Sequence, residues 1–287
     1  MNIVVICLLL YHLIKAVFVS NCSGAGIGRA LALQLAQHRP TLILWDKCES
    51  RNLETIALIE AEQGEGSFTC YPYTLDVGCF QQVKAAAEKV LEKVGLVDIL
   101  INNAGIVHGK LLSQLSEADI RATFNCNLFA HFWTIKCFLP SMQEANSGHI
   151  VAVASVASIV GSSRISDYSA SKFGLIGLME SLDVELRNEG YTGIHLTTVS
   201  PYFVHTGLFH GIQTKYHAVL PILKPAYVAE RIILAIQWRL EFVYIPRMLY
   251  LMLASKGLMP MSVLRYLGYG FGAHTAMDTF SRLETGP

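Results

Sequence analysis

The sequence predicts an α/β fold in which a doubly wound parallel sheet carries a layer of helices on each face, three layers in a single domain. Two observations support this prediction. Apolar, strand-like runs alternate along the chain with longer segments of helical period, which is the pattern of successive strand–helix–strand units. The length of 287 residues suits one large α/β domain, and no repeat or linker divides the chain.

The expected strands are short runs rich in branched and aromatic residues, and they cover residues 16–20, 41–45, 68–74, 99–101, 150–153 and 195–199. The expected helices cover residues 26–37, 51–62, 80–93, 117–142, 168–188 and 226–238. Ser116 and Asp119 suit the start of the fourth helix, because a hydroxyl can accept from a free amide and an acid suits the positive end of a helix. Pro140 predicts that this helix stops close to that residue.

The amino-acid composition restricts which kinds of partner the protein is expected to bind. Apolar residues make up 52% of the chain and charged residues only 15%, against about 25% charged in an average soluble domain. A membrane surface is one place for the excess apolar surface. Lysine plus arginine equals aspartate plus glutamate at 22 each, so nucleic acid is not an expected partner. The seven cysteines are scattered and form no C-x-x-C, which predicts reduced thiols and neither a disulfide framework nor a metal site.

Residues 3–14 form an almost wholly apolar run that ends at Lys15. The run is shorter than the roughly 20 residues of a membrane-spanning helix, and it lacks the basic start and cleavage site of a secretory signal. Three interpretations stay open: a short membrane anchor, a shortened relic of a longer one, or a buried segment that leads into the first strand.

A glycine-rich turn joins the first strand to the first helix. Glycines let the backbone turn tightly and approach a pyrophosphate, which is then held at the start of the helix. The residues expected to bind a dinucleotide in this turn are Ser23, Gly24, Gly26, Ile27 and Gly28.

Acidic residues follow the second and third strands. Asp46 ends the second strand, where a carboxylate can accept hydrogen bonds from both ribose hydroxyls of NAD and would repel the 2′-phosphate of NADP. NAD is therefore the expected cofactor rather than NADP, with a solvated loop aspartate as the alternative. Asp76 could bond the adenine edge, although an ordinary turn aspartate explains it nearly as well.

The fourth strand ends in Asn102, Asn103, Ala104 and Gly105. Small residues there leave room for a cofactor, so Asn103, Ala104 and Gly105 are expected to line its site. Ligands of open α/β sheets bind beyond the carboxyl ends of the strands. The turns after the first four strands should therefore converge on one crevice.

Tyr168 and Lys172 are four residues apart at the start of a helix and share one face. Ser155 lies thirteen residues upstream, just past a strand and so at the same sheet edge. A phenol with a pKa of about 10 is a poor base, but an adjacent ammonium and a cationic nicotinamide favour the phenolate. Tyr168 could then take an alcohol proton while hydride leaves the carbon, with Ser155 holding the substrate oxygen and Lys172 the cofactor ribose.

Spacing alone does not establish this pair, because Tyr11 and Lys15 repeat it inside the N-terminal run. Only the second pair has a serine at the same sheet edge. The alternative is a half-buried helix tyrosine beside a solvated lysine. A hydrolase is disfavoured, because Ser155 does not lie in a G-x-S-x-G turn.

Together the glycine-rich turn, the N-N-A-G segment, Ser155 and the Y-S-A-S-K run at 168–172 resemble the short-chain dehydrogenase/reductase family, over about residues 16–250. The resemblance implies a Rossmann-like fold, a nicotinamide cofactor and an oxidoreductase that acts on CH–OH groups. It also implies that Asn127 is a fourth catalytic residue, at which the long helix kinks to hold a proton-relay water. From the sequence alone, Asn127 is only a mid-helix asparagine.

A closer similarity is to the membrane-associated retinol dehydrogenases and 17β-hydroxysteroid dehydrogenases of subfamily 16C, and to the epidermal retinol dehydrogenases in particular. The stretches that carry it are A-H-F-W-T at 130–134, F-L-P at 138–140, G-H-I-V at 148–151 and L-P-I-L-K-P at 220–225. This similarity implies a hydrophobic alcohol substrate, attachment to the cytosolic side of the endoplasmic reticulum membrane or to lipid droplets, and a homodimer.

The family's turn is altered in this chain, since its threonine and first glycine fall at Asn21 and Cys22. A cysteine fits this turn only if its φ is negative or if strain is tolerated, so the affinity for the cofactor stays open. Pro201, followed by a bulky residue as is usual in the subgroup, is expected at the cofactor. Thr206 matches the family threonine that contacts the nicotinamide carboxamide.

Residues 207–221 occupy the place of the family's substrate loop. The apolar residues in and before this loop suit an apolar ligand, and could equally be core; they are Phe203, Leu208, Phe209 and Ile212. From 242 to 277 the chain has no acidic residue, and Pro246 and Pro260 divide it into short pieces. Such a basic, apolar stretch suits a membrane interface; a dimer-forming or core-covering helix is the alternative.

The chain thus divides into an apolar N-terminal segment at 1–15, a dehydrogenase domain at 16–245 and an apolar, basic extension at 246–287. The leading hypothesis is an NAD-dependent oxidoreductase acting at a membrane on a hydrophobic alcohol, retinol first and a 17β-hydroxysteroid or other lipid alcohol second. The other hypothesis, suggested by Cys22, is a catalytically weak protein that binds lipid or a partner.

Overall fold

The computed structural model describes residues 17–64, 66, 68–212, 215, 220–270, 272, 274–275 and 277–280. The predicted N-terminal segment, with Tyr11 and Lys15, lies outside these residues. Among the helices that are described, none combines the length and the apolar character needed to cross a bilayer.

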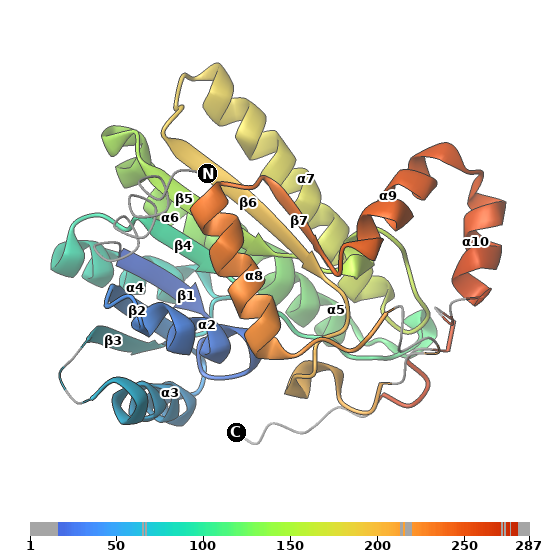
Figure 1. The fold of residues 1–287 in the computed structure, drawn as a ribbon, viewed down its shortest axis with the longest axis horizontal. Helices are drawn as coiled ribbons and strands as arrows, with labels where there is room; N and C mark the ends of the chain where they lie inside the picture. The colour runs from blue at the N-terminus through green and yellow to red at the C-terminus, as the bar shows by residue number, and fades with distance from the viewer. Residues whose placement is uncertain are drawn as a thin grey trace.

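Seven parallel strands form one sheet (Figure 1), in the order β3-β2-β1-β4-β5-β6-β7. The strands are β1 (Val17–Asn21), β2 (Thr41–Asp46), β3 (Thr69–Thr74), β4 (Ile99–Asn102), β5 (Gly148–Val153), β6 (Ile194–Pro201) and β7 (Phe242–Ile245). Because the winding reverses between β1 and β4, the carboxyl ends of these strands flank the position where α/β sheets bind ligands. The predicted fold class is confirmed.

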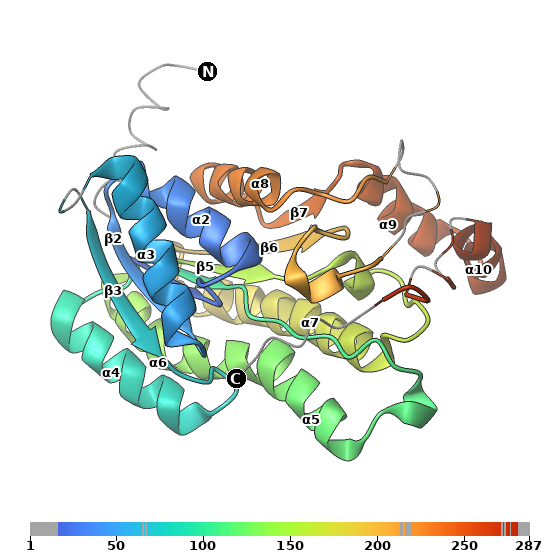
Figure 2. The ribbon, with the colours of Figure 1, turned by 90° about the horizontal axis from the view of Figure 1, so that it is seen from below.

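Helices cover both faces of the sheet (Figure 2). One layer holds α2 (Gly26–Ala36), α3 (Glu49–Gln63) and α8 (Pro225–Trp238), and the other holds α4 (Phe80–Val94), α5 (Glu117–Phe124), α6 (Ala130–Ala145) and α7 (Ser166–Asn188). Strand β2 shows how the sheet serves both layers: Leu42 and Leu44 pack into one core, and Ile43 and Trp45 into the other. Burial on both faces explains why the strands read as continuous apolar runs.

All six predicted strands are present, with ends that shift by one or two residues. The seventh, β7, is only four residues long and follows a helix directly. It carries no alternation, because three of its four residues are buried. From the sequence, these residues were predicted as part of the domain but not as a strand.

The prediction of one helix over residues 117–142 was wrong. A turn of π-helix at Asn125–Phe129 separates α5 from α6. The predicted stop at Pro140 was also wrong, because α6 continues to Ala145. Proline removes only one backbone donor, and the buried Phe138 and Met142 hold the helix against the sheet on either side of it.

Two helices follow β7 and project from the edge of the molecule (Figure 1). They are α9 (Met248–Leu258) and α10 (Met261–Gly270), and they begin just after Pro246 and Pro260. Leu249 is the one residue of α9 that is fully buried, and no residue of α10 is. We call this pair of helices the C-terminal hairpin.

Candidate active site

The turn after β1 has the shape of a dinucleotide site. Gly26 has a φ of +55°, and a Cβ at Gly28 would collide with the carbonyl oxygen of Cys22. Helix α2 begins at Gly26, its N-cap residue Ala25 supplies no side-chain hydrogen bond, and its first turn has no acidic residue. The first amides of the helix can therefore bind a phosphate. The residues present therefore fit a nicotinamide dinucleotide.

Cys22 has a φ of +52°, so of the two possibilities that the sequence left open, the strained one holds. The left-handed region costs a residue with a Cβ roughly 1–2 kcal/mol. The cysteine keeps the backbone conformation that a glycine would adopt without strain, and the turn is formed.

Asn21 joins the ends of β1 and β4. Its Oδ1 accepts from the backbone amides of Asn103 and Ala104, each at 2.6 Å, and its Nδ2 donates to Asn102 Oδ1 at 2.8 Å. The side chain of Asn103 in turn donates to the Asn21 carbonyl at 3.3 Å. Sequence reasoning recorded Asn21 only as a departure from the family and missed this function.

Asp46 lies at the end of β2 and closes the same turn. One carboxylate oxygen accepts from the Gly24 amide at 2.9 Å and the other from the Cys48 amide at 3.0 Å. Ser23 is fully buried, and its hydroxyl donates to the carbonyl oxygen of Trp45 and to Asn52 Oδ1. Ser23 therefore shapes the turn from inside the protein, whereas Asp46 stands at the carboxyl end of the strand.

The other predicted cofactor residues lie at the same sheet edge. Asp76 accepts from the Gly78 amide at 2.9 Å and from Lys47 Nζ at 3.2 Å. A Cβ on Gly105 would lie 3.7 Å from both Lys172 Nζ and Asn127 Oδ1, so the loop after β4 reaches the catalytic helix. The remaining three are Ile27 at the start of α2, Pro201 at the end of β6, and Thr206, whose methyl group faces Gly26.

Tyr168, Lys172 and Ser155 lie together and are buried, with exposed fractions of 3%, 2% and 7%. Ser155 follows β5, and its side chain lies close enough to the Tyr168 phenol to lower the pKa of that phenol. Lys172 Nζ lies 5.8 Å from the centroid of the Tyr168 ring and donates to the Val153 carbonyl at 2.8 Å. The structure thus brings the predicted trio to one point at the sheet edge.

Burial dominates the acid–base properties of this trio. It raises the pKa of Tyr168 to about 12, against a smaller lowering by the Ser155 side chain. It lowers the pKa of Lys172 to about 8. These shifts are those of the protein without a nicotinamide. That the ammonium and a cationic nicotinamide together favour the phenolate stays a prediction.

Asn127 lies in the π-helical turn between α5 and α6 and is fully buried. Its Oδ1 accepts from the Ile106 amide at 2.8 Å, and its Nδ2 donates to the Ile106 carbonyl at 3.0 Å and to Ser171 Oγ at 3.2 Å. The long helix is therefore irregular at the residue where the family resemblance implied a kink. Such π-turns concentrate at functional sites.

An apolar wall covers the outer side of Tyr168. Phe209 meets the Tyr168 ring edge-on at 5.8 Å and the Phe203 ring at 5.2 Å. The buried residues that complete this cluster are Val107, Ala157, Ile165, Ile212 and Met277. Residues from the loops after β4, β5 and β6 and from the end of the chain thus surround the phenol.

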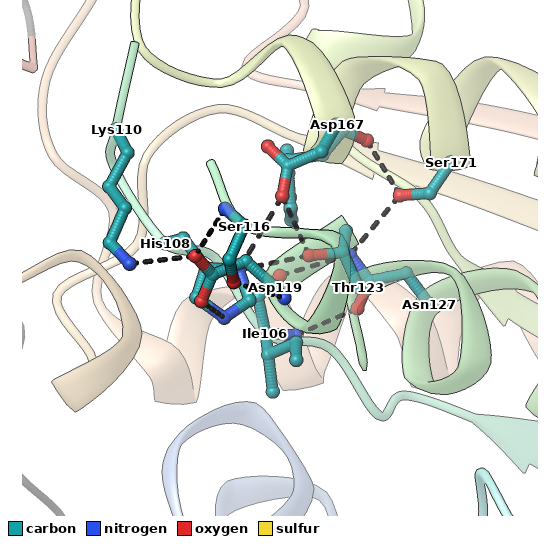
Figure 3. Close-up of polar contacts among 10 residues, drawn as sticks. Ile106, His108, Lys110, Ser116, Asp119, Thr123, Asn127, Asp167 and Ser171 are labelled. Carbon is teal, nitrogen blue, oxygen red and sulfur yellow. Dashed lines mark hydrogen bonds and ion pairs between the residues drawn. The ribbon is translucent and has the colours of Figure 1, made fainter. Parts of the chain in front are cut away.

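A polar network lies beside the trio, and Figure 3 shows its members. His108, from the loop after β4, reaches Thr123 and Asp119 of α5 and Asp167 of α7. Sequence reasoning missed it, because each member is a single polar residue on a separate element. The position of Asp167 directly before Tyr168 is the only signal of it in the sequence.

Comparisons with known proteins agree with this geometry. The sequence model of the family described as short chain dehydrogenase matches residues 15–217. Short-chain dehydrogenase/reductase family 16C member 6 of Bos taurus is 40% identical over 250 residues, which cover 86% of this chain and 78% of that protein. Epidermal retinol dehydrogenase 2 of Homo sapiens is 38% identical over 258 residues, with 90% and 82% covered.

Solved structures of similar fold contain nicotinamide cofactors. A short chain dehydrogenase/reductase from Burkholderia phymatum in complex with NAD superposes with a TM-score of 0.74 at 26% identity, over 95% of this chain and 97% of that one. An alcohol dehydrogenase from Thermococcus sibiricus complexed with 5-hydroxy-NADP superposes with a TM-score of 0.71 at 26% identity, over 80% and 96%. The protein is thus an oxidoreductase of CH–OH groups that uses a nicotinamide cofactor, and the chain belongs to the short-chain dehydrogenase family.

Proposed function

We propose that this protein uses NAD to oxidise a hydrophobic alcohol, retinol, to its carbonyl compound. The observation that carries the proposal is the buried Tyr168 phenol, which has Ser155 and Lys172 beside it and packs with Phe203 and Phe209 on its apolar side. A proton acceptor beside an apolar wall suits an alcohol on a long hydrocarbon chain.

The side chains divide the work as follows. Ser155 holds the substrate oxygen by a hydrogen bond, and Tyr168 takes the hydroxyl proton. Lys172 binds the ribose and, when a cationic nicotinamide is also present, helps to favour the phenolate. Asn127 fixes the loop after β4 through Ile106. When bound, the nicotinamide accepts the hydride.

The choice of NAD over NADP rests on Asp46. Its carboxylate is fixed by two backbone amides at the end of β2. A negative charge held there disfavours a 2′-phosphate, and the carboxylate oxygens can accept hydrogen bonds from the ribose hydroxyls of NAD. Asp46→Asn should therefore narrow the difference between the affinities for NADH and NADPH.

Retinol is preferred over other substrates because relatives at 36–38% identity are named retinol dehydrogenases. A 17β-hydroxysteroid or another lipid alcohol is the alternative, since the apolar cluster around Tyr168 suits any hydrophobic alcohol.

The purified protein with NAD and retinol should yield retinaldehyde, and Tyr168→Phe should abolish the product while NADH binding persists. Both can be followed by chromatography and by NADH fluorescence. Retinaldehyde formation by the variant at the rate of the unmodified protein would refute the role of Tyr168. Oxidation of a 17β-hydroxysteroid in preference to retinol would favour the alternative substrate.

A catalytically weak protein on the same fold is favoured by one observation, the positive φ of Cys22. A titration with NADH separates the two functions. Binding in the micromolar range or tighter supports the dehydrogenase; no detectable binding, recovered by Cys22→Gly, supports the weak protein.

We also propose that the C-terminal hairpin places the enzyme on a membrane or lipid-droplet surface, on the cytosolic side. The hairpin exposes large apolar side chains, among them Leu251 at 67%, Leu258 at 85% and Tyr266 at 77%. Arg247 and Arg265 are exposed on it, and no acidic residue opposes them. Apolar area with basic side chains is the combination that binds anionic lipid.

Flotation with vesicles that contain anionic lipid tests this surface. Leu258→Glu with Tyr266→Glu should reduce the bound fraction severalfold. Leu53→Glu is the matched control, because Leu53 is 51% exposed on α3, away from the hairpin. Equal loss in both would contradict the proposal. The homodimer that the resemblance implies stays a prediction, which sedimentation velocity in detergent can test.

A further inference from the structure

A chain of ionisable side chains leads from the partly exposed Lys110 to the start of the catalytic helix (Figure 3). Lys110 Nζ lies 2.7 Å from Asp119 Oδ2, and Asp119 Oδ1 lies 3.3 Å from His108 Nε2. His108 Nδ1 lies 3.4 Å from Asp167 Oδ2 and 3.0 Å from Thr123 Oγ1. Lys110 is partly exposed, whereas His108, Thr123 and Asp167 are buried.

The hydrogen bonds define which atoms carry protons. Thr123 donates its hydroxyl proton to Asp167 Oδ2 at 2.7 Å, so toward His108 it can only accept, and Nδ1 of the ring must donate. The other ring nitrogen faces the carboxylate of Asp119, whose pKa is held well below its usual range by hydrogen bonds from Lys110 and Ser116. Each ring nitrogen of His108 therefore lies beside an oxygen of a neighbouring element, and Nδ1 is the one that donates a hydrogen bond.

The network also compensates the buried charge of Asp167. Its Oδ2 has Thr123 and His108, and its Oδ1 has no hydrogen-bond partner within the described part of the chain. A buried carboxylate that loses its partners is strongly destabilised. The position of Asp167 therefore depends on His108 and Thr123.

Two connections tie this network to the reacting groups. Asp167 directly precedes Tyr168 in α7, and Thr123 lies four residues before Asn127 at the end of α5. Ser171 closes the connection from the other side, because it accepts from Asn127 Nδ2 at 3.2 Å and donates to the Tyr168 carbonyl at 2.7 Å. The helix that carries Tyr168 and the π-turn that carries Asn127 are thereby held at a fixed spacing.

We infer that His108, Thr123 and Asp167 are positioning residues for the dehydrogenase reaction: a buried histidine held between Asp119, Thr123 and Asp167 fixes the Tyr168 helix against the loop after β4 and the π-turn of Asn127. None of the three touches the reacting atoms. They act through the placement of the phenol, and a displacement of the order of 1 Å at a reacting group can cost up to about 100-fold in rate.

Substitutions at Thr123 test this role, because valine keeps the shape of threonine and removes its hydroxyl. We expect Thr123→Val to lower kcat by about 10-fold with an unchanged dissociation constant for NADH, and Thr123→Ser to restore most of kcat. The alcohol is retinol, and thermal unfolding of each variant is measured alongside.

Thr197→Val is the matched control. Thr197 is a fully buried threonine that bonds a buried histidine, His149, at 2.7 Å, but it lies on β6 with its partner at the start of β5, away from the site. It should lower stability and leave kcat unchanged. Equal losses of kcat in Thr123→Val and Thr197→Val, or no recovery in Thr123→Ser, would overturn the inference.

The hydrogen-bond role of His108 is tested without a substrate. With ¹⁵N-labelled histidine, Nδ1 of His108 should show the shift of a nitrogen that carries a proton, and His108→Gln assigns the signal. An unprotonated Nδ1 would overturn the arrangement in which His108 donates to Thr123. Because this measurement does not involve turnover, a failure of the proposed retinol oxidation leaves it unaffected, and the two failures can be told apart.

Discussion

At the scale of single residues, the first turn shows how a function can survive the loss of its usual residue. Asn21 holds the amides of Asn103 and Ala104 with one oxygen and reaches Asn102 with its nitrogen, so the ends of β1 and β4 stay joined. Cys22 beside it adopts a positive φ. The strained backbone at Cys22 thus lies next to Asn21, whose hydrogen bonds hold the turn in place.

The strain at Cys22 can be measured with a matched pair of variants. Cys22→Gly and Cys22→Ala both remove the thiol, but only alanine keeps a Cβ in the left-handed region. We expect the glycine variant to be more stable to urea by about 1 kcal/mol and to bind NADH at least as tightly. An alanine variant as stable as the glycine variant would show that the turn is not strained.

Lys172 predicts a pH dependence of stability. Burial lowers its pKa from 10.5 to about 8, so between these values the unfolded chain binds the additional proton and stability from this group rises with pH. Lys172→Met should therefore be the more stable protein near pH 7, with an advantage that shrinks toward about pH 10. Urea unfolding at a series of pH values measures this difference.

The difference between the two proteins isolates Lys172, because the buried cysteines and Tyr168 contribute to both. Lys84→Met, at a lysine with 62% of its side chain exposed, should show no such trend. A constant difference between Lys172→Met and the unmodified protein across this range would contradict the lowered pKa.

At the scale of elements, the region from α5 to α6 is one that sequence patterns predicted incorrectly. Residues 117–142 have the composition of one continuous helix. No local sequence signal distinguishes the π-turn at Asn125–Phe129 from the helix on either side of it. Its causes are contacts to distant segments: Asn127 bonds Ile106 and Ser171. The strands and most helix ends were predictable because their signals are local, whereas this turn was not.

Pro140 offers a direct test within α6. It lies away from both ends of the helix, and its side chain is exposed to solvent. At such a position proline is about 3 kcal/mol less favourable than alanine. Pro140→Ala should raise the free energy of unfolding by about 1–3 kcal/mol, as measured with urea. Lys136→Ala, at another exposed position of α6, should change it by less than about 0.5 kcal/mol. A loss of stability in Pro140→Ala would show that the proline is required.

At the scale of the whole molecule, the residues of the site could be predicted from the sequence, but the segments that pack around Tyr168 could not. Tyr168, Lys172 and Ser155 were recognisable from spacing and from the sheet edge. The return of the chain's end to that edge was not, because Met277 lies more than a hundred residues from Tyr168 and carries no motif. Packing between segments so far apart in sequence leaves no local pattern.

Gly109 tests how this return affects the reaction. Its φ is +68°, and a Cβ there would collide with the ring of Phe280. Gly109→Ala should displace the end of the chain and raise KM for the alcohol severalfold, with NADH binding unchanged, and Phe280→Ala should act alike. Gly95→Ala is the control, because Gly95 also has a positive φ, of +76°, and open space around it. A similar KM in all variants would show that the contact between Gly109 and Phe280 does not affect binding of the alcohol.

The same return has a consequence for biosynthesis. Domains begin to fold while the ribosome is still adding residues, starting from the N-terminus, so the sheet and the turn after β1 can form early. Met277 packs into the cluster around Tyr168, and Asp278 pairs with Arg164 at 3.2 Å, contacts that a nascent chain cannot make until these two residues have left the ribosome. A nascent chain stalled before residue 277 should therefore bind the dinucleotide before it acquires the closed side of its alcohol site.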